Sequence, residues 1–167
     1  MVVMDELLDL VDCNDQVIGQ EWRSVIYSQG NSNFRVVNAF LMNENGQLWI
    51  PRRCATKTIF PSCLDTSMGG HVMVGDTYEQ AFKRELIEEL NLDASLISYE
   101  LIGKLNPYQH DMSAFMQVYL IKTNTVPNYN QKDFSEYFWL KPHEILTVLA
   151  SGDQSKSDLP KIVKILF

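Results

Sequence analysis

Apolar and β-branched residues gather in short runs along the chain, and turn-forming residues separate them. This pattern predicts strands where the runs are short, because a strand places alternate side chains on opposite faces. Asn45-Gly46 lies between two such runs and is a strong signal for a β-hairpin. Pro51 is expected to end the second run. The predicted strands cover residues 6–12, 16–19, 36–42, 47–51, 98–105, 113–121 and 136–140.

One segment has a clear helical period. Thr77 and Gln80 have the spacing of a capping box, which predicts a helix that begins there and continues to Leu90. Phe82, Leu86 and Leu90 form an apolar ridge on that helix, and Asn91 is suited to a left-handed residue at its end. Pro residues at 142 and 160 are expected in the first turns of two later helices.

The chain contains no internal repeat, low-complexity tract or linker. Strands and helices alternate over 167 residues, so we expect one mixed α/β domain covering residues 1–167.

Composition narrows the class of function. The net charge is −7 and basic residues cluster no further than the Arg52-Arg53 pair, so nucleic acid is not an expected partner. Cys13, Cys54 and Cys63 have no metal-binding spacing and indicate a reducing compartment. The acidic N-terminus is unlike a secretory signal, and no apolar run is long enough for a membrane span. We expect a soluble cytoplasmic protein. An acidic protein of this kind can still bind a phosphorylated substrate if a divalent cation bridges the two.

Three carboxylates crowd one face of the predicted helix. Glu85, Glu88 and Glu89 follow i, i+3, i+4 spacing, at which like charges repel by roughly 0.2–0.5 kcal/mol per pair. One interpretation is a solvated acidic face, with Arg84 pairing to Glu88. The Gly-rich entry at 69–76 favours another, in which the carboxylates bind a hard cation such as Mg²⁺ or Mn²⁺.

The same residues resemble the Nudix box, G-x5-E-x7-R-E-U-x-E-E-x-G-U, in which U is a bulky aliphatic residue. It covers residues 70–92 here, from Gly70 through Asp76 to Arg84-Glu85-Leu86 and on to Leu92, and seven of nine defined positions match. The resemblance implies a Nudix-type α/β/α sandwich with a mixed sheet, and hydrolysis of a diphosphate linkage.

The resemblance also implies roles for individual residues. Glu85, Glu88 and Glu89 match the metal-ligand positions, and Gly70 matches a glycine that supplies a carbonyl ligand. Arg84 would orient the glutamates, and Glu89 is the candidate general base. Glu136, on a late strand, is another candidate base or a structural residue.

Two positions depart from the box. Asp76 replaces a glutamate that supports the arginine, which shortens its reach to Arg84 unless the backbone shifts. Asn91 replaces the closing glycine, a milder change because Asn tolerates a positive φ.

Beyond the box, residues 51–72 resemble the Nudix branch that includes isopentenyl diphosphate isomerases. In that branch Arg53 and Lys57 would contact the diphosphate. An isomerase has a cysteine where Gly69 stands, and several metal-binding histidines, whereas this chain has only His71, His110 and His143. We therefore expect hydrolysis rather than isomerisation.

A third hypothesis is a weakly active Nudix domain that binds a nucleotide. Nucleoside diphosphates, nucleotide sugars, dinucleoside polyphosphates and non-nucleotide diphosphates all remain open as ligands. The apolar N-terminal strand could pair across a homodimer.

Overall fold

The computed structural model describes residues 4–167; the first three residues of the N-terminal stretch lie outside the described part. Within that part, six strands form a mixed sheet in the order β6-β7-β3-β4-β8, with β5 paired to β3. The central β3 and β7 run parallel, and the other pairs are antiparallel. The sheet strands are β3 (Arg35–Met42), β4 (Leu48–Arg53), β5 (Met68–His71), β6 (Tyr99–Leu105), β7 (Phe115–Lys122) and β8 (Phe134–Leu140).

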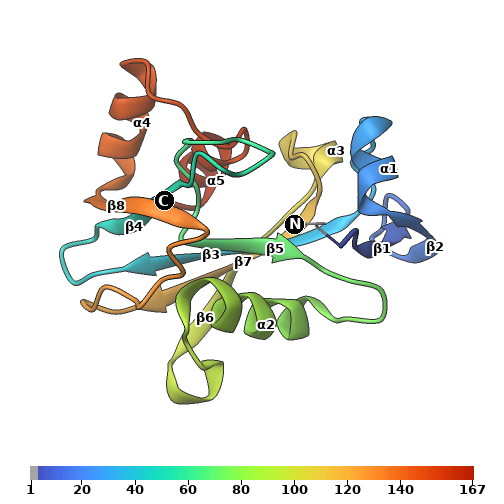
Figure 1. Ribbon diagram of the computed structural model, residues 1–167, viewed down its shortest axis with the longest axis horizontal. Helices are drawn as coiled ribbons and strands as arrows, with labels where there is room; N and C mark the ends of the chain where they lie inside the picture. Colours follow the sequence, from blue (N-terminus) through green and yellow to red (C-terminus); the bar gives the residue numbers. More distant parts are fainter. Residues whose placement is uncertain (1–3) are drawn as a thin grey trace.

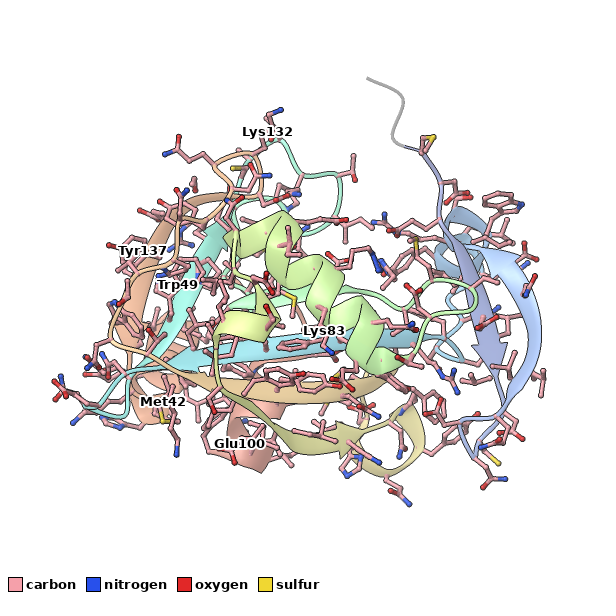
Figure 2. The ribbon with its side chains drawn as sticks, turned by 90° about the horizontal axis from the view of Figure 1, so that it is seen from below. Met42, Trp49, Lys83, Glu100, Lys132 and Tyr137 are labelled. Atoms are coloured by element: carbon pink, nitrogen blue, oxygen red, sulfur yellow. The ribbon has the colours of Figure 1, made fainter. Side chains whose placement is uncertain are left out.

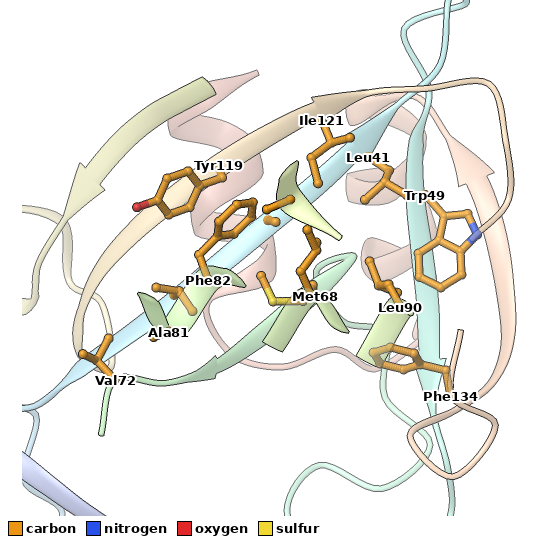
Figure 3. Packing of buried hydrophobic residues seen from close by; sticks show 14 residues of the cluster. Leu41, Trp49, Met68, Val72, Ala81, Phe82, Leu90, Tyr119, Ile121 and Phe134 are labelled. Carbon is orange, nitrogen blue, oxygen red and sulfur yellow. The ribbon is translucent and has the colours of Figure 1, made fainter. Parts of the chain in front are cut away.

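Helices cover both faces of this sheet. Figure 1 shows α2 (Tyr78–Leu90) below the sheet, with α4 (Pro142–Ala150) and α5 (Leu159–Leu166) above it. Each interface has its own apolar core, as expected when two faces of a sheet are buried. In the lower core, Phe82 of α2 stacks on Tyr119 of β7 (Figure 3). The predicted α/β/α sandwich with a mixed sheet is confirmed.

The hairpin at Asn45-Gly46 is confirmed, but Pro51 does not end its second strand. β4 continues to Arg53, and Pro51 pairs with Tyr137 of β8. The carbonyl of Pro51 accepts a hydrogen bond from the Asp65 N–H, away from β8. In a strand, the backbone nitrogen and oxygen of one residue point to the same side. The nitrogen of Pro51, which carries no hydrogen, therefore points toward that loop and not toward β8. Beside it, Trp49 and Tyr137 stack across β4 and β8 (Figure 2).

A small unit at the N-terminus packs against one end of the main sheet. β1 (Leu7–Val11) and β2 (Val17–Trp22) form the expected hairpin, and α1 (Arg23–Ser28) follows without a break. The apolar side chains of Leu8 and Ile26 are buried against Phe34. The sequence analysis missed α1, whose six residues are too few for a helical period to show.

The helix that carries the acidic residues is confirmed in detail. Thr77 caps it, and both hydrogen bonds of the capping box with Gln80 are present. Asn91 ends it with φ 52°, the left-handed conformation expected there. Phe82, Leu86 and Leu90 are fully buried, and the glutamates lie on the adjoining face of α2, where Glu85 is buried as well. The short helices η1 (Ala94–Leu96) and α3 (Pro107–His110) were not predicted.

The glycine pair before α2 lies within a strand rather than in a turn. β5 includes Gly69 and Gly70, which pair with Asn38 and Val37 of β3. Two consecutive glycines make a strand hard to recognise from the hydrophobic pattern, because they have no side chains to alternate.

No helix in residues 4–167 is long and apolar enough to cross a membrane.

Candidate functional site

A pocket of about 580 Å³ opens between α2, β5 and the N-terminal unit. Glu85, Glu88 and Glu89 line it from α2, and Gly69 and Gly70 line it from β5. In the N-terminal unit, α1 contributes to the wall. The other walls come from residues distant in the sequence, in the loop after β4 and in the segment before α5. The fold therefore brings the predicted acidic residues to the edge of a cavity large enough for a small molecule.

The Glu85 side chain lies directly against Gly70. A Cβ atom at position 70 would be 2.0 Å from Glu85 Cδ and 2.3 Å from Cγ, so only glycine fits. Burial raises the pKa of Glu85 to about 8, partly opposed by the positive charge of Arg84. Glu85 is thus a carboxyl group that is costly to ionise.

Glu89 is held by the neighbouring glycine. Its Oε2 accepts a hydrogen bond from the backbone N–H of Gly69 at 3.0 Å. Burial, together with the charge of Glu85, raises the pKa of Glu89 well above its ordinary value. The two glutamates therefore share one confined space, where a nearby positive charge would lower the cost of ionising both.

Glu88 is more open than the other two. Its side chain is 59% exposed and lies 4.0 Å from Arg84 Nε, the ion pair that the solvated-face interpretation expected. Within residues 4–167, no three acidic, histidine or cysteine side chains form a complete metal-binding set. The structure thus brings Glu85 and Glu89 together and leaves Glu88 at the rim.

The donor chemistry nevertheless fits a hard divalent cation. Glu85 and Glu89 offer carboxylate oxygens that lack a full set of partners, and the cradle at Gly70 exists only because no Cβ fills it. Oxygen donors of this kind suit Mg²⁺ or Mn²⁺, which keep water ligands for a phosphate substrate to replace.

Arg84 joins the start of α2 to β5. Its Nη1 lies 3.1 Å from Asp76 Oδ2, and its Nη2 donates to the carbonyl of His71 at 2.8 Å. Nη2 also lies 3.5 Å from Glu85 Oε1. Asp76 therefore reaches the arginine despite being shorter than the glutamate of the box.

Arg53 and Lys57 both line the pocket, and each is already paired with an acidic residue. Arg53 contacts Asp65 at 3.0 Å and donates to the carbonyls of Ile59 and Phe60. Lys57 pairs with Asp133. Both cations hold the loop after β4 in place, which lowers their capacity for new hydrogen bonds.

The N-terminal unit supplies a wall that the sequence analysis missed. His71 Nδ1 lies 3.0 Å from Glu6 Oε2, and His71 Nε2 lies 2.8 Å from the Tyr27 hydroxyl. Burial lowers the pKa of His71, and Glu6 opposes this. Arg23 lies over the Tyr27 ring at 5.5 Å. No local motif marks these residues, since they meet only through the fold.

Other residues singled out from the sequence lie elsewhere. Glu136 pairs with Arg52, its side chain is 52% exposed, and it does not line the pocket. All three cysteines are free thiols, and among the described residues none of them lines the pocket.

Comparison with known proteins identifies the family. The family model described as NUDIX domain matches residues 32–159. An uncharacterized Nudix hydrolase of Nostoc sp. is 57% identical over 97% of this chain and 96% of its own length. The crystal structure of DR0079 from Deinococcus radiodurans has a TM-score of 0.91 and 42% identity, covering 97% of this chain and 99% of that one.

A second kind of relative is more distant. Isopentenyl-diphosphate Delta-isomerase 2 of Photorhabdus laumondii is 30% identical over 82% of this chain and 78% of its own length. The Nostoc hydrolase is more similar to this chain than the isomerase is, and it covers more of it. The chain belongs to the Nudix family and is a Nudix hydrolase, which acts on diphosphate-containing substrates by hydrolysing a phosphorus anhydride.

Proposed function

We propose that the protein is a metal-dependent hydrolase of a nucleoside diphosphate derivative or a related organic diphosphate. One observation carries this proposal: Glu85 and Glu89, two carboxyl groups with raised pKa values, face the same pocket beside Gly70. A divalent cation would relieve the cost of ionising both and would attract the anionic substrate.

Each box residue has a proposed role. Glu85, Glu89 and the Gly70 carbonyl would hold Mg²⁺ or Mn²⁺, with Glu88 turning in from the rim. Bound there, the cation neutralises phosphate charge and acidifies a water molecule. Glu89 is proposed to accept the proton of the attacking water, because the Gly69 N–H fixes its carboxylate. Arg84 positions Glu85 and the β5 backbone rather than touching the substrate.

The organic group of the substrate is proposed to lie toward the N-terminal unit. Tyr27, Phe34 and His71 form an aromatic wall there, with ring centroids 5.6–5.9 Å apart. Such a surface favours a planar group such as a nucleobase. Arg53 and Lys57 would add positive potential near the diphosphate while remaining bound to Asp65 and Asp133.

We further propose that residues 1–167 act as one Nudix domain in the cytoplasm; three free thiols support the location.

A homodimer would use β2 rather than β1. The apolar side chains Leu8 and Val11 of β1 are already buried within the chain. Val17, Ile18 and Trp22 on β2 are exposed apolar residues that a second copy would cover.

An isomerase is the second candidate, favoured by the identity to the Photorhabdus enzyme. Isomerisation needs a proton donor and an acceptor on opposite faces of the alkene. Gly69 offers no thiol, and Cys63 is buried outside the pocket. These observations favour hydrolysis over isomerisation.

The experiment compares substrates directly. The purified protein is incubated with Mg²⁺ or Mn²⁺ and a panel of nucleoside diphosphates, nucleotide sugars, dinucleoside polyphosphates and isopentenyl diphosphate. Phosphate-containing products from any diphosphate, absent when EDTA is added, support the hydrolase. Conversion of isopentenyl diphosphate to its isomer would support the second candidate. Saturable binding without turnover across the panel would indicate a nucleotide-binding domain instead.

A further inference from the structure

The cations around the pocket differ in how far their charges are already used. Among residues 4–167, four basic side chains line it: Arg23, Arg53, Lys57 and Lys156. Arg53 and Lys57 are engaged as described above, and Arg23 lies 3.4 Å from Glu6. Lys156, in the segment between α4 and α5, is the least engaged of the four. The sequence alone did not point to it.

Lys156 has one weak ionic contact. Its Nζ lies 3.7 Å from Asp65 Oδ1, beyond hydrogen-bond distance. Asp65 already has stronger partners, because Oδ2 accepts from Arg53 at 3.0 Å and Oδ1 from the Thr66 N–H at 2.8 Å. Asp65 therefore does not depend on Lys156, and the three donors of the ammonium group are available.

The backbone of Lys156 is fixed at the pocket wall. Its N–H donates to the Leu64 carbonyl at 2.9 Å, and its own carbonyl accepts from the Leu159 N–H at 3.1 Å and from the Ser155 hydroxyl at 3.0 Å. The side chain is 34% exposed. A rigid backbone with an uncommitted, partly solvated ammonium group is suited to binding a ligand that arrives from solution.

Lys156 also faces the residues of the Nudix box across one cavity. The pocket that it lines is lined as well by the residues proposed to hold the cation, which are Gly70, Glu85, Glu88 and Glu89. A phosphate group bound at that cation would therefore lie in the same cavity as the ammonium group.

We propose that Lys156 is a substrate-binding residue whose ammonium group donates charge-assisted hydrogen bonds to a phosphate group of the diphosphate. The inference rests on the proposed hydrolase function and adds to it a cation from outside the Nudix box. Such bonds are among the strong ones in proteins, and loss of one typically weakens binding by about 10- to 100-fold.

The test uses binding before turnover. Isothermal titration calorimetry measures the affinity of the Mg²⁺-loaded protein for imidodiphosphate, a diphosphate analogue whose P–N–P bridge resists hydrolysis. Lys156→Met should weaken binding by about 10- to 100-fold, whereas Lys156→Arg should restore most of it. Lys132→Met is the matched control, because Lys132 is an exposed lysine on the surface (Figure 2) that does not line the pocket.

A structural role for Lys156 is distinguished by two readouts. The first readout is kinetics with a diphosphate that the protein hydrolyses: Lys156→Met should raise KM and change kcat less. The second is the melting temperature, which should be unchanged. Lys156→Gln, which keeps a polar head near Asp65, repeats the test should the Met variant unfold.

The contrary outcomes are separate from those of the hydrolase proposal. Unchanged affinity in folded Lys156→Met or Lys156→Gln, or an equal loss in Lys132→Met, overturns the role of Lys156. So does a wild-type protein that fails to bind imidodiphosphate at millimolar concentration. Binding that depends on Lys156 in a protein that hydrolyses no diphosphate would uphold this inference while contradicting the proposed function.

Discussion

The side chain of Glu85 occupies the space that a Cβ atom on residue 70 would need. Cδ of Glu85 would be 2.0 Å from such an atom, far inside any van der Waals contact. Gly70 thus leaves room for the Glu85 carboxylate directly beside the backbone of β5. The strand β5 and the helix α2 are fitted to each other at this pair.

Gly70→Ala should abolish most activity without unfolding the protein. The added methyl group forces Glu85 to another rotamer, and misplacing a catalytic group by about 1 Å can cost roughly 100-fold in rate. Gly19→Ala in β2 is the control, because its nearest contact would be an ordinary 3.9 Å from Leu10. Turnover and melting temperature are measured for both. Full activity in Gly70→Ala would show that the position of Glu85 is not critical.

The contact between Asp76 and Arg84 gives a second prediction. Because Asp76 already reaches the guanidinium at 3.1 Å, Asp76→Glu should leave turnover within about threefold of wild type. Asp76→Asn removes the charge and should lower turnover by about 10-fold or more, as loss of outer partners of metal ligands does. A large increase in kcat/KM for Asp76→Glu would instead show that Asp76 holds Arg84 too loosely for full activity.

The raised pKa values predict an unusual pH dependence of stability for the metal-free protein. The pKa of Glu85 is about 8 in the fold and about 4.5 when exposed, so the folded state binds more protons between these values. The contribution of Glu85 to stability should therefore be full at and below about pH 4.5 and fall as pH rises towards 8. Glu89 acts in the same direction. In calorimetry with EDTA, Glu85→Gln should flatten this slope.

The raised pKa values of Glu85 and Glu89 also predict the effect of metal on stability. Mn²⁺ or Mg²⁺ should raise the melting temperature more at pH 8 than at pH 5, because it stabilises the ionised carboxylates. An equal shift at both pH values, or a metal-free protein that is more stable at pH 8 than at pH 5, would contradict the burial of Glu85 as the cause.

Asn91 allows the end of α2 to be tested apart from the chemistry. Its φ of 52° is left-handed, and its side chain donates to the Asn128 carbonyl. Asn91→Ala should cost about 2 kcal/mol, from an unfavourable φ and a lost hydrogen bond. Asn91→Gly loses only the bond and should cost about 1 kcal/mol. Urea unfolding measures both; equal losses would show that the left-handed conformation contributes nothing.

Much of this fold follows from local signals. The capping box at Thr77, the apolar ridge on α2 and the Asn45-Gly46 hairpin each depend on residues close in sequence, and each is confirmed. The errors occur where tertiary contacts override a local rule. Pro51 continues a strand because its missing N–H faces a loop, and Gly69-Gly70 form a strand because β3 pairs with them.

The residues of the site also fall into two groups, those that the sequence spacing identifies and those that only folding brings together. The box lies within one contiguous segment, so its glutamates, Arg84 and Gly70 could be identified from spacing. Tyr27, Asp133 and Lys156 come from three distant parts of the chain and carry no motif, and they meet at the pocket only after folding. Similarly, only the folded structure shows that Arg53 and Lys57 are paired with Asp65 and Asp133.

The most direct test of the central claim is the turnover of glutamate variants with one diphosphate substrate and Mg²⁺ or Mn²⁺. Glu85→Gln and Glu89→Gln should each lose activity by orders of magnitude while remaining folded, and Glu88→Gln, at the rim, should lose less. Glu100→Gln is the control, because Glu100 is an exposed glutamate of β6 (Figure 2) that does not line the pocket. Full activity in Glu85→Gln, Glu88→Gln and Glu89→Gln alike would contradict the assignment of this site.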